Sequence, residues 1–325
     1  MSGIQVKNGK AFEYACLKSL SETLSKSQEI VIENTKEFNN AKDYFESSPV
    51  ILKNDLINAA NAFTRIILRL EPQLQYSNDN IPLFISLQKD DAGKKGDVRD
   101  ILCLRQQNGW QIGFSCKHNH KAVKHSRLSA VLDFGRQWFG INCSESYFQA
   151  IIPIFEELKE IRKTSNKTAL WADIENKNER FYLPILNAFV NELKNLASLN
   201  PDKIPELLIR YLVGQNDFYK IITDSKNKTT KLEAINLYGS LNKKSGENHP
   251  IVSIQKLKLP TKFYHIGMKP NSETTIEIIC DEGWHIALRI HNASSRVEAS
   301  LKFDVNLISY PSNLFVQTEP WEERV

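Results

Sequence analysis

An aspartate, a serine and a lysine lie where they could together carry out phosphodiester hydrolysis. Asp97 follows a glycine at the start of one strand-like segment, and Ser115 and Lys117 stand two residues apart at the end of the next. Side chains two residues apart on a strand leave the same face of a sheet. A carboxylate can hold Mg²⁺, and a lysine can orient water and offset charge on the phosphate. The pattern predicts all three as catalytic, with Asp97 as a metal ligand.

A further acidic side chain is expected beside these three residues. Glu13 lies on a predicted N-terminal helix, off its apolar face, and is the best candidate for a second catalytic and metal-binding carboxylate. A structural interpretation stands beside the catalytic one. An aspartate after a glycine is commonly a turn or cap residue, and a lysine at a strand end is commonly solvated. The spacing by itself leaves both interpretations open.

The segments around these residues have the pattern of a β-hairpin. Residues 98–106 alternate apolar and polar side chains, an Asn-Gly turn signal follows, and residues 110–117 form the returning segment. This hairpin would place Asp97 at its start and Lys117 at its end. The carboxylate and the ammonium would then meet at one edge of the sheet.

The rest of the chain divides by its periodicity. Residues 9–26 have the spacing of an amphipathic helix, residues 120–140 are predicted as another, and residues 150–163 as a strand that becomes helical after its proline. From about residue 229 onward, short β-prone runs alternate with turn residues. We therefore expect a mixed α+β or α/β domain at 1–228, with helical insertions, and a β-rich region at 229–325.

Composition and charge exclude several classes of protein. Of the 325 residues, 41% are hydrophobic and 25% charged, which is typical of a soluble globular protein. No apolar run reaches the roughly 20 residues of a membrane span, and no signal peptide is evident, so a cytoplasmic protein is expected. Five cysteines without metal-ligand spacing favour reduced, buried thiols over disulfides or zinc.

A basic stretch follows the hairpin directly. Residues 117–127 contain four Lys or Arg and three His with no acidic residue, which suits binding to a polyanion. On the predicted helix, Lys121, Lys124 and His125 would share one side. A solubilising surface is the alternative, and His120 could also take part in proton transfer. The predicted DNA contacts here are His118, Asn119, His120, Lys121, Lys124, His125 and Arg127.

A second polar cluster near the C-terminus could read base edges. Arginine to guanine is the commonest specific contact in the major groove. Glu298 and Asp304 could accept from cytosine or could orient the arginines. A simple Asn-Ala-Ser-Ser turn is the structural alternative. The residues predicted to bind DNA in this segment are Arg289, Asn292, Arg296 and Lys302.

Several strings resemble a known family. Asp97 with Ser115-Cys116-Lys117, and Glu13 on the preceding helix, resemble the PD-(D/E)xK nuclease pattern. The longer strings GKAFEYACL (9–17), CKHNHKAVKHSRLS (116–129) and RIHNASSRVEASLKFDVNL (289–307) resemble HaeIII-type restriction endonucleases. The similarity extends over most of the chain. The contiguous HNH at 118–120 differs from the ββα-metal nuclease motif, which spreads these residues over a longer segment.

The resemblance implies a PD-(D/E)xK core of mixed β-sheet flanked by helices, with a β-rich DNA-recognition region. It implies a Type II restriction endonuclease that cuts double-stranded DNA with Mg²⁺ at a short palindrome, GGCC in the type member. A palindrome predicts a homodimer, and a cognate DNA methyltransferase is expected in the same system.

One departure from the pattern keeps alternatives open. Ser115 stands where the pattern has an acid, so either Glu13 supplies the second carboxylate or Ser115 holds a metal-bound water. The number of metal ions is therefore open. A structure-specific repair or recombination nuclease, and a non-catalytic DNA-binding regulator with a degenerate core, are the alternatives.

Overall fold

The computed structural model describes residues 2–76, 81–89, 97–106, 109–119, 124–292 and 294–322. The chain forms two compact units. The first unit comprises Met1–Lys121, Gln215–Leu257 and Asn313–Val325, and the second comprises Ala122–Gly214 and Lys258–Ser312. This division differs from the predicted boundary at residue 228. The central helices belong with the C-terminal strands, and the last strand returns to the first unit.

The first unit contains a seven-stranded mixed sheet. Its strands, in spatial order, are β1 (Ile30–Ile32), β2 (Leu83–Leu87), β3 (Ile101–Arg105), β4 (Trp110–His118), β6 (Phe218–Asp224), β7 (Thr229–Ile235) and β12 (Val316–Pro320). β3 and β4 pair antiparallel, which confirms the predicted hairpin. β4 and β6 pair in parallel. The sheet therefore has the mixed character that the sequence predicted.

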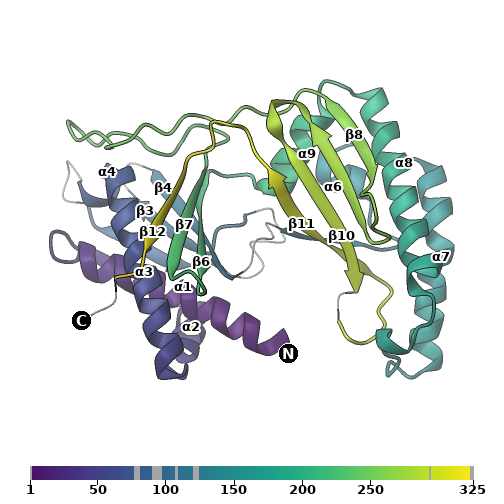
Figure 1. Ribbon diagram of the computed structural model, residues 1–325, viewed down its shortest axis with the longest axis horizontal. Helices are drawn as coiled ribbons and strands as arrows, with labels where there is room; N and C mark the ends of the chain where they lie inside the picture. The colour runs from purple at the N-terminus through teal and green to yellow at the C-terminus, as the bar shows by residue number, and fades with distance from the viewer. Residues whose placement is uncertain are drawn as a thin grey trace. The chain divides into compact units, whose positions relative to one another are not determined.

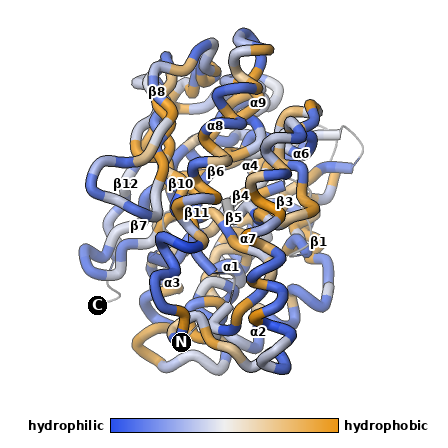
Figure 2. The backbone as a smooth tube through the Cα atoms, turned by 90° about the vertical axis from the view of Figure 1, so that its right-hand side faces the viewer, coloured by the Kyte–Doolittle hydropathy of each residue, from blue (hydrophilic) through white to orange (hydrophobic). Residues whose placement is uncertain are grey.

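Helices cover one face of this sheet (Figure 1). They are α1 (Ser2–Leu24), α2 (Lys36–Glu46), α3 (Val50–Leu70) and the short α4 (Pro72–Gln75). The predicted helical spacing in α1 is confirmed, because Phe12, Cys16 and Leu20 are all fully buried. They share a core with Phe114 and Cys116 of β4. The mixture of hydrophobic and hydrophilic residues along α2 and α3 is visible in Figure 2.

The second unit contains a five-stranded antiparallel sheet. Its strands, in spatial order, are β5 (Lys124–Leu128), β11 (Leu301–Ser309), β10 (His285–Asn292), β9 (Thr275–Cys280) and β8 (Phe263–Met268). The helices of this unit are α6 (Phe134–Phe139), α7 (Glu145–Thr164), α8 (Leu183–Leu199) and α9 (Ile204–Val213), with short helical turns at Trp171–Asp173, Asn178–Tyr182 and Asp281–Gly283. Phe189 of α8 packs edge-on against Phe303 of β11, so this helix covers the apolar face of the sheet.

The helix predicted over residues 120–140 is wrong at residues 124–128. These residues form β5, which pairs with β11, and among the described residues of this segment the helical ones are Phe134–Phe139. The apolar spacing within the segment is compatible with a helix, but pairing with β11 satisfies the backbone groups of residues 124–128 through a partner distant in sequence. Lys124 and His125, which were predicted on one side of a helix with Lys121, belong to strand β5.

The strand predicted before Pro153 is also wrong, because α7 runs continuously from Glu145 to Thr164. Ser144 caps its first turn by accepting from the backbone N–H of Tyr147. Pro153 removes one helical hydrogen bond, but buried side chains on both sides of it, such as Ile151 and Phe155, anchor the helix.

Two further predictions concern the thiols and membranes. The five cysteines are free and buried, as expected. Within the described part of the chain, none of the helices has the length and apolar character needed to cross a bilayer.

Candidate active site

The β3–β4 hairpin brings Asp100, Ser115 and Lys117 together. The backbone N–H of Asp100 donates to the carbonyl of Phe114 over 2.7 Å, which places Asp100 at the start of the ladder. Its Oδ2 accepts from the backbone N–H of Cys116 over 2.7 Å and from the Ser115 hydroxyl over 3.4 Å. The same oxygen lies 3.5 Å from Nζ of Lys117. Asp100 and Lys117 are each 22% exposed, so a ligand can reach both.

Glu13 of helix α1 lies close enough to this cluster to interact electrostatically with Asp100 and Lys117. The residue is only 7% exposed, and its Oε2 accepts from Nζ of Lys10 over 3.1 Å. Burial raises the pKa of Glu13 to about 8, the negative charge of Asp100 adds to the increase, and the positive charges of Lys10 and Lys117 oppose it. A carboxyl group with a raised pKa keeps its proton more strongly, and a cation bound beside it would lower that pKa and favour the carboxylate. We call Glu13, Asp100, Ser115 and Lys117 the candidate catalytic cluster, or catalytic cluster for short.

Asp97 lies outside this cluster, contrary to its predicted pairing with Lys117. Its carboxylate accepts from Nε of Arg99 over 2.8 Å, from Nη2 over 2.6 Å, and from the Gln88 amide over 3.0 Å. Burial alone would raise the pKa of Asp97, but these hydrogen bonds outweigh it and lower the pKa below its ordinary value. Arg99 in turn occupies the space beside Gly113, where an added Cβ would approach its Cδ to 2.1 Å. Asp97 thus anchors Arg99 against β4.

Asp100 is the functional candidate that sequence reasoning missed. A signal was present, because Asp100 is the acidic residue immediately before the buried strand segment Ile101–Arg105. The turn signal at the glycine before Asp97 favoured Asp97 as the carboxylate beside Lys117, whereas Asp100, three residues later, lies there. Only the register of β3 against β4 shows which carboxylate lies opposite Ser115 and Lys117.

A buried ion pair lies beside the cluster on the neighbouring strands. Lys220 of β6 is the register partner of Ser115, and Glu233 of β7 is the register partner of Lys220. Nζ of Lys220 lies 3.7 Å from Oε2 of Glu233, and both side chains are at most 2% exposed. Burial lowers the pKa of Lys220 to about 8, Glu233 opposes that decrease, and the positive charge of Lys117 adds to it. No local pattern of residues predicted this pair.

The catalytic cluster fits a hard divalent cation. Among the described residues no group of three His, Cys, Asp or Glu forms a ready metal site. Mg²⁺ does not need one, because it keeps several waters and binds through one or two carboxylates together with substrate phosphate. Glu13 and Asp100 supply two carboxyl groups, and burial together with the negative charge of Asp100 raises the pKa of Glu13. The two carboxyl groups therefore offer oxygen ligands that Mg²⁺ prefers, and its positive charge would offset their negative charge.

The predicted contacts just after β4 have mixed placements. The ring of His118 lies 6.4 Å from that of Phe12, and burial lowers the pKa of His118, against a smaller opposing effect of Asp55. Asn119 exchanges hydrogen bonds with Ser225, so it ties β4 to the turn after β6. His120 and Lys121 lie outside the described residues, as do the side chains of Lys124 and His125.

The remaining predicted DNA contacts belong to the second unit. Arg289 and Lys302 lie on β10 and β11. Arg127 is exposed on β5, with Nη1 3.1 Å from the Ser300 hydroxyl and 3.6 Å from Glu298. Asn292 donates to the carbonyl of Ser294. Arg296 is exposed in a segment that forms a β-bridge with Leu170.

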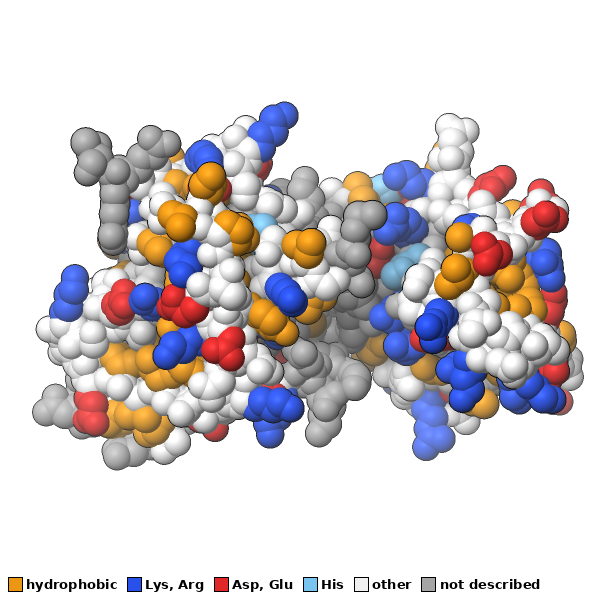
Figure 3. Space-filling view, turned by 90° about the horizontal axis from the view of Figure 1, so that it is seen from below, with side chains coloured by type: hydrophobic (Ala, Val, Ile, Leu, Met, Phe, Trp, Pro, Cys, Tyr) orange, Lys and Arg blue, Asp and Glu red, His pale blue; other side chains and the backbone are white. Residues whose placement is uncertain are grey.

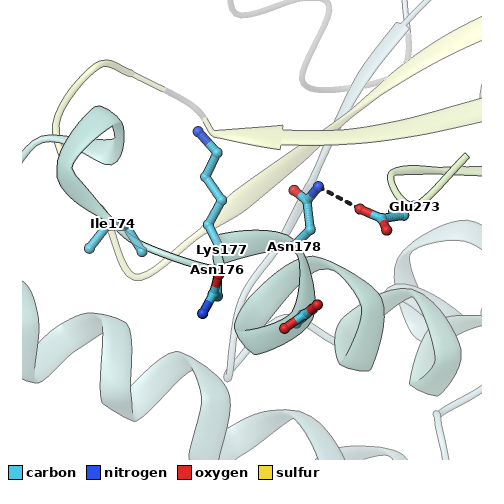
Figure 4. A pocket seen from close by; sticks show the side chains of 6 residues that line it. Ile174, Asn176, Lys177, Asn178 and Glu273 are labelled. Atoms are coloured by element: carbon cyan, nitrogen blue, oxygen red, sulfur yellow. Dashed lines mark hydrogen bonds between the residues drawn. The ribbon is translucent and has the colours of Figure 1, made fainter.

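A pocket of about 280 Å³ also lies in the second unit (Figure 4). It is lined by Ile174, Asn176, Lys177, Asn178, Glu179 and Glu273. The Asn178 amide donates to Glu273 over 2.9 Å. None of the predicted site residues lines this pocket, so the candidate active site is the cluster on the hairpin.

Comparison with known proteins gives matches over nearly the whole chain. A family model described as HaeIII restriction endonuclease matches residues 9–311. The Type II restriction enzyme HaeIII of Haemophilus aegyptius is 38% identical over 323 residues, which covers 99% of this chain and 100% of that protein. No solved structure gives a significant match.

Proposed function

The chain belongs to the HaeIII restriction endonuclease family and is a Type II restriction endonuclease, and on this premise we propose that its catalytic cluster hydrolyses phosphodiesters of double-stranded DNA with Mg²⁺. One observation carries the proposal. The Asp100 carboxylate lies 3.5 Å from the Lys117 ammonium at the partly exposed end of the β3–β4 hairpin. At this separation the carboxylate can hold a cation beside a phosphate while the ammonium stabilises negative charge on the same phosphate.

Each residue of the cluster has a distinct role in this proposal. Asp100 and Glu13 would hold the cation, which when bound would polarise the phosphate and acidify water. Two donors, the Cys116 N–H and the Ser115 hydroxyl, fix the Asp100 carboxylate. Lys117 would orient the attacking water and stabilise negative charge on the phosphate in the transition state. Asp97, whose carboxylate is engaged by Arg99, would support the hairpin instead of binding metal.

The buried Glu13 carboxyl supports one of the two explanations for the serine at position 115. The acid that the PD-(D/E)xK pattern places two residues before the lysine is replaced here by a serine hydroxyl, which is a weaker metal ligand. Glu13 reaches the same cluster from α1, as its interaction with Asp100 and Lys117 indicates. We therefore assign the second metal-binding carboxylate to Glu13, with Ser115 orienting Asp100.

The resemblance supports finer assignments for the substrate and the assembly. GGCC is the proposed recognition sequence, and its twofold symmetry leads us to expect a homodimer. A cognate DNA methyltransferase would protect the host, and the site of action would be the cytoplasm. His118, Asn119, Arg127, Arg289, Asn292, Arg296 and Lys302 remain the proposed DNA contacts among the described side chains.

Digestion of a sequenced plasmid tests the proposed function directly. With Mg²⁺ we expect discrete fragments whose mapped ends lie within one short palindrome, and EDTA should stop the reaction. A continuous smear would indicate a nuclease without sequence specificity. Binding without strand scission at any Mg²⁺ concentration would contradict a catalytic role for the cluster.

A further inference from the structure

The sheet of the second unit has one apolar face and one polar face. Ile286, Leu288 and Ile290 of β10 are buried, and they alternate with the polar side chains of the same strand. The register extends this polar face across β11 and β5, because Arg289 pairs with Asp304 and His291 pairs with Lys302, which pairs with Arg127. Figure 3 shows Lys, Arg and His side chains lying together on this unit.

Asp304 holds two neighbouring side chains on this polar face. Its Oδ2 accepts from Nη2 of Arg289 over 2.6 Å, and its Oδ1 lies 3.0 Å from Nε2 of His291. The other ring nitrogen of His291, Nδ1, lies 2.8 Å from the backbone carbonyl of Asn292. Asp304 is 11% exposed at its side chain, whereas that of Arg289 is 58% exposed. A buried carboxylate therefore anchors an exposed guanidinium.

This arrangement suits a neutral base edge better than a phosphate. The Asp304 carboxylate repels a second anion, so it weakens the attraction of Arg289 for phosphate. The contact at Nη2 uses one of the five N–H donors of the guanidinium, and the others can reach outward. Guanine presents two neutral acceptors, N7 and O6, to a fork of this kind in the major groove.

We infer that Arg289, oriented by Asp304 and flanked by His291, reads the N7/O6 edge of a guanine in the target site. The inference rests on the proposed function and deepens it by naming the base and the atoms. Asp304 acts as a positioning residue for Arg289. Lys302, on the same face without an ion pair among the described residues, contacts backbone phosphate.

The test measures binding in Ca²⁺ to duplexes that carry the mapped site. In these duplexes each guanine is replaced in turn by 7-deazaguanine, which lacks the N7 acceptor. For one guanine, wild-type protein should lose about tenfold in affinity, because one of the two acceptors of the bidentate contact is removed. Arg289→Ala should bind both duplexes equally, and Arg289→Lys, which keeps the charge but not the fork, should also fail to discriminate.

Variants of Asp304 and Lys302 test the inference through two measured quantities, the discrimination ratio and the salt slope, which a merely structural role would leave unchanged. Asp304→Ala should reduce the discrimination ratio, and Asp304→Asn, which keeps one acceptor oxygen, should restore part of it. Lys302→Ala should weaken both duplexes alike and lower the salt slope by about one. Lys163→Ala, an exposed charge on α7, is the control and should match wild type.

The outcomes separate this inference from the proposed function. If Arg289→Ala and Arg289→Lys bind less tightly but keep the full discrimination, Arg289 contacts phosphate and the inference is overturned. A wild-type protein that cuts at discrete sites yet tolerates 7-deazaguanine at every position also overturns it. A wild-type protein that does not cut at discrete sites contradicts the proposed function itself.

Discussion

The Asp100 carboxylate, and not that of Asp97, lies beside the Lys117 ammonium, at 3.5 Å. The Asp97 carboxylate instead accepts a bidentate pair of hydrogen bonds from Arg99 on the same segment. Two aspartates three residues apart thus have different environments, one facing the strand that carries Lys117 and one holding an arginine. The environment of Asp100 suits a metal ligand, and the environment of Asp97 suits a residue that stabilises the hairpin.

Exchanging each aspartate for asparagine should separate these two roles. Asp100→Asn should lower the rate of cleavage by about a thousandfold, because a metal-binding carboxylate contributes several kcal/mol to the transition state. Binding to DNA in Ca²⁺ and the melting temperature should change little. The measurement is single-turnover cleavage of a duplex with one mapped site.

Asp97→Asn is the matched variant. Loss of the charged contact with Arg99 should reduce the free energy of unfolding by about 1–3 kcal/mol, with substantial cleavage remaining at a temperature where the protein is folded. The reverse result, in which Asp97→Asn is inactive and Asp100→Asn cuts normally, would show that Asp97 and not Asp100 is the metal ligand.

Replacement of Lys117 should slow the chemical step more than it weakens binding. Lys117→Met keeps the length of the side chain and removes its charge, and the expected loss in kcat is about 10²–10³-fold. Lys231→Met removes a neighbouring charge, one that is 40% exposed and paired with Glu233, and should cut within a fewfold of wild type. Equal losses in the two variants would argue for a general effect of positive charge.

The roles of Glu13 and Ser115 can be ranked by comparing their variants. Glu13→Gln should reduce cleavage at least about a hundredfold and raise the Mg²⁺ concentration needed for half-maximal rate, because it removes a metal-binding carboxylate. Ser115→Ala removes only the 3.4 Å contact to Asp100 and should cost about tenfold or less. A larger loss for Ser115→Ala than for Glu13→Gln would place a metal-bound water on the serine.

Stability should fall as pH rises when metal is absent. The pKa of Glu13 is about 8 in the folded protein and about 4.5 when unfolded, so the folded state binds one more proton between these values. The resulting stabilisation is complete below pH 4.5 and is lost progressively up to pH 8, by about 1.4 kcal/mol per pH unit. Urea unfolding in EDTA between pH 5.5 and 7.5 measures this slope.

Two comparisons isolate the contribution of Glu13 to that slope. Glu71, whose pKa is raised to about 7 mainly by burial, adds a slope of the same sign, so Glu71→Gln serves as the control variant. Glu13→Gln and Glu71→Gln should each remove part of the pH dependence, and Mg²⁺ should flatten only the part that depends on Glu13. An unchanged slope in Glu13→Gln would show that its carboxyl titrates normally.

The sequence by itself determined the local elements and the type of chemistry. Alternation of side chains predicted the β3–β4 hairpin, helical spacing predicted α1, and Ser115 and Lys117 could be placed on one face because a strand has a two-residue period. Helical spacing likewise placed Glu13 on α1. These features depend only on neighbouring residues, so a short window of sequence contains them.

Only the tertiary structure decided which distant groups meet. The register of β3 against β4 selected Asp100 over Asp97, and pairing with β11 made residues 124–128 a strand where local spacing favoured a helix. The same holds for Lys220 and Glu233 beside Ser115, and for Asp304 beneath Arg289. Pairing between remote segments is governed by the free energy of the whole sheet, which no local pattern of side chains contains.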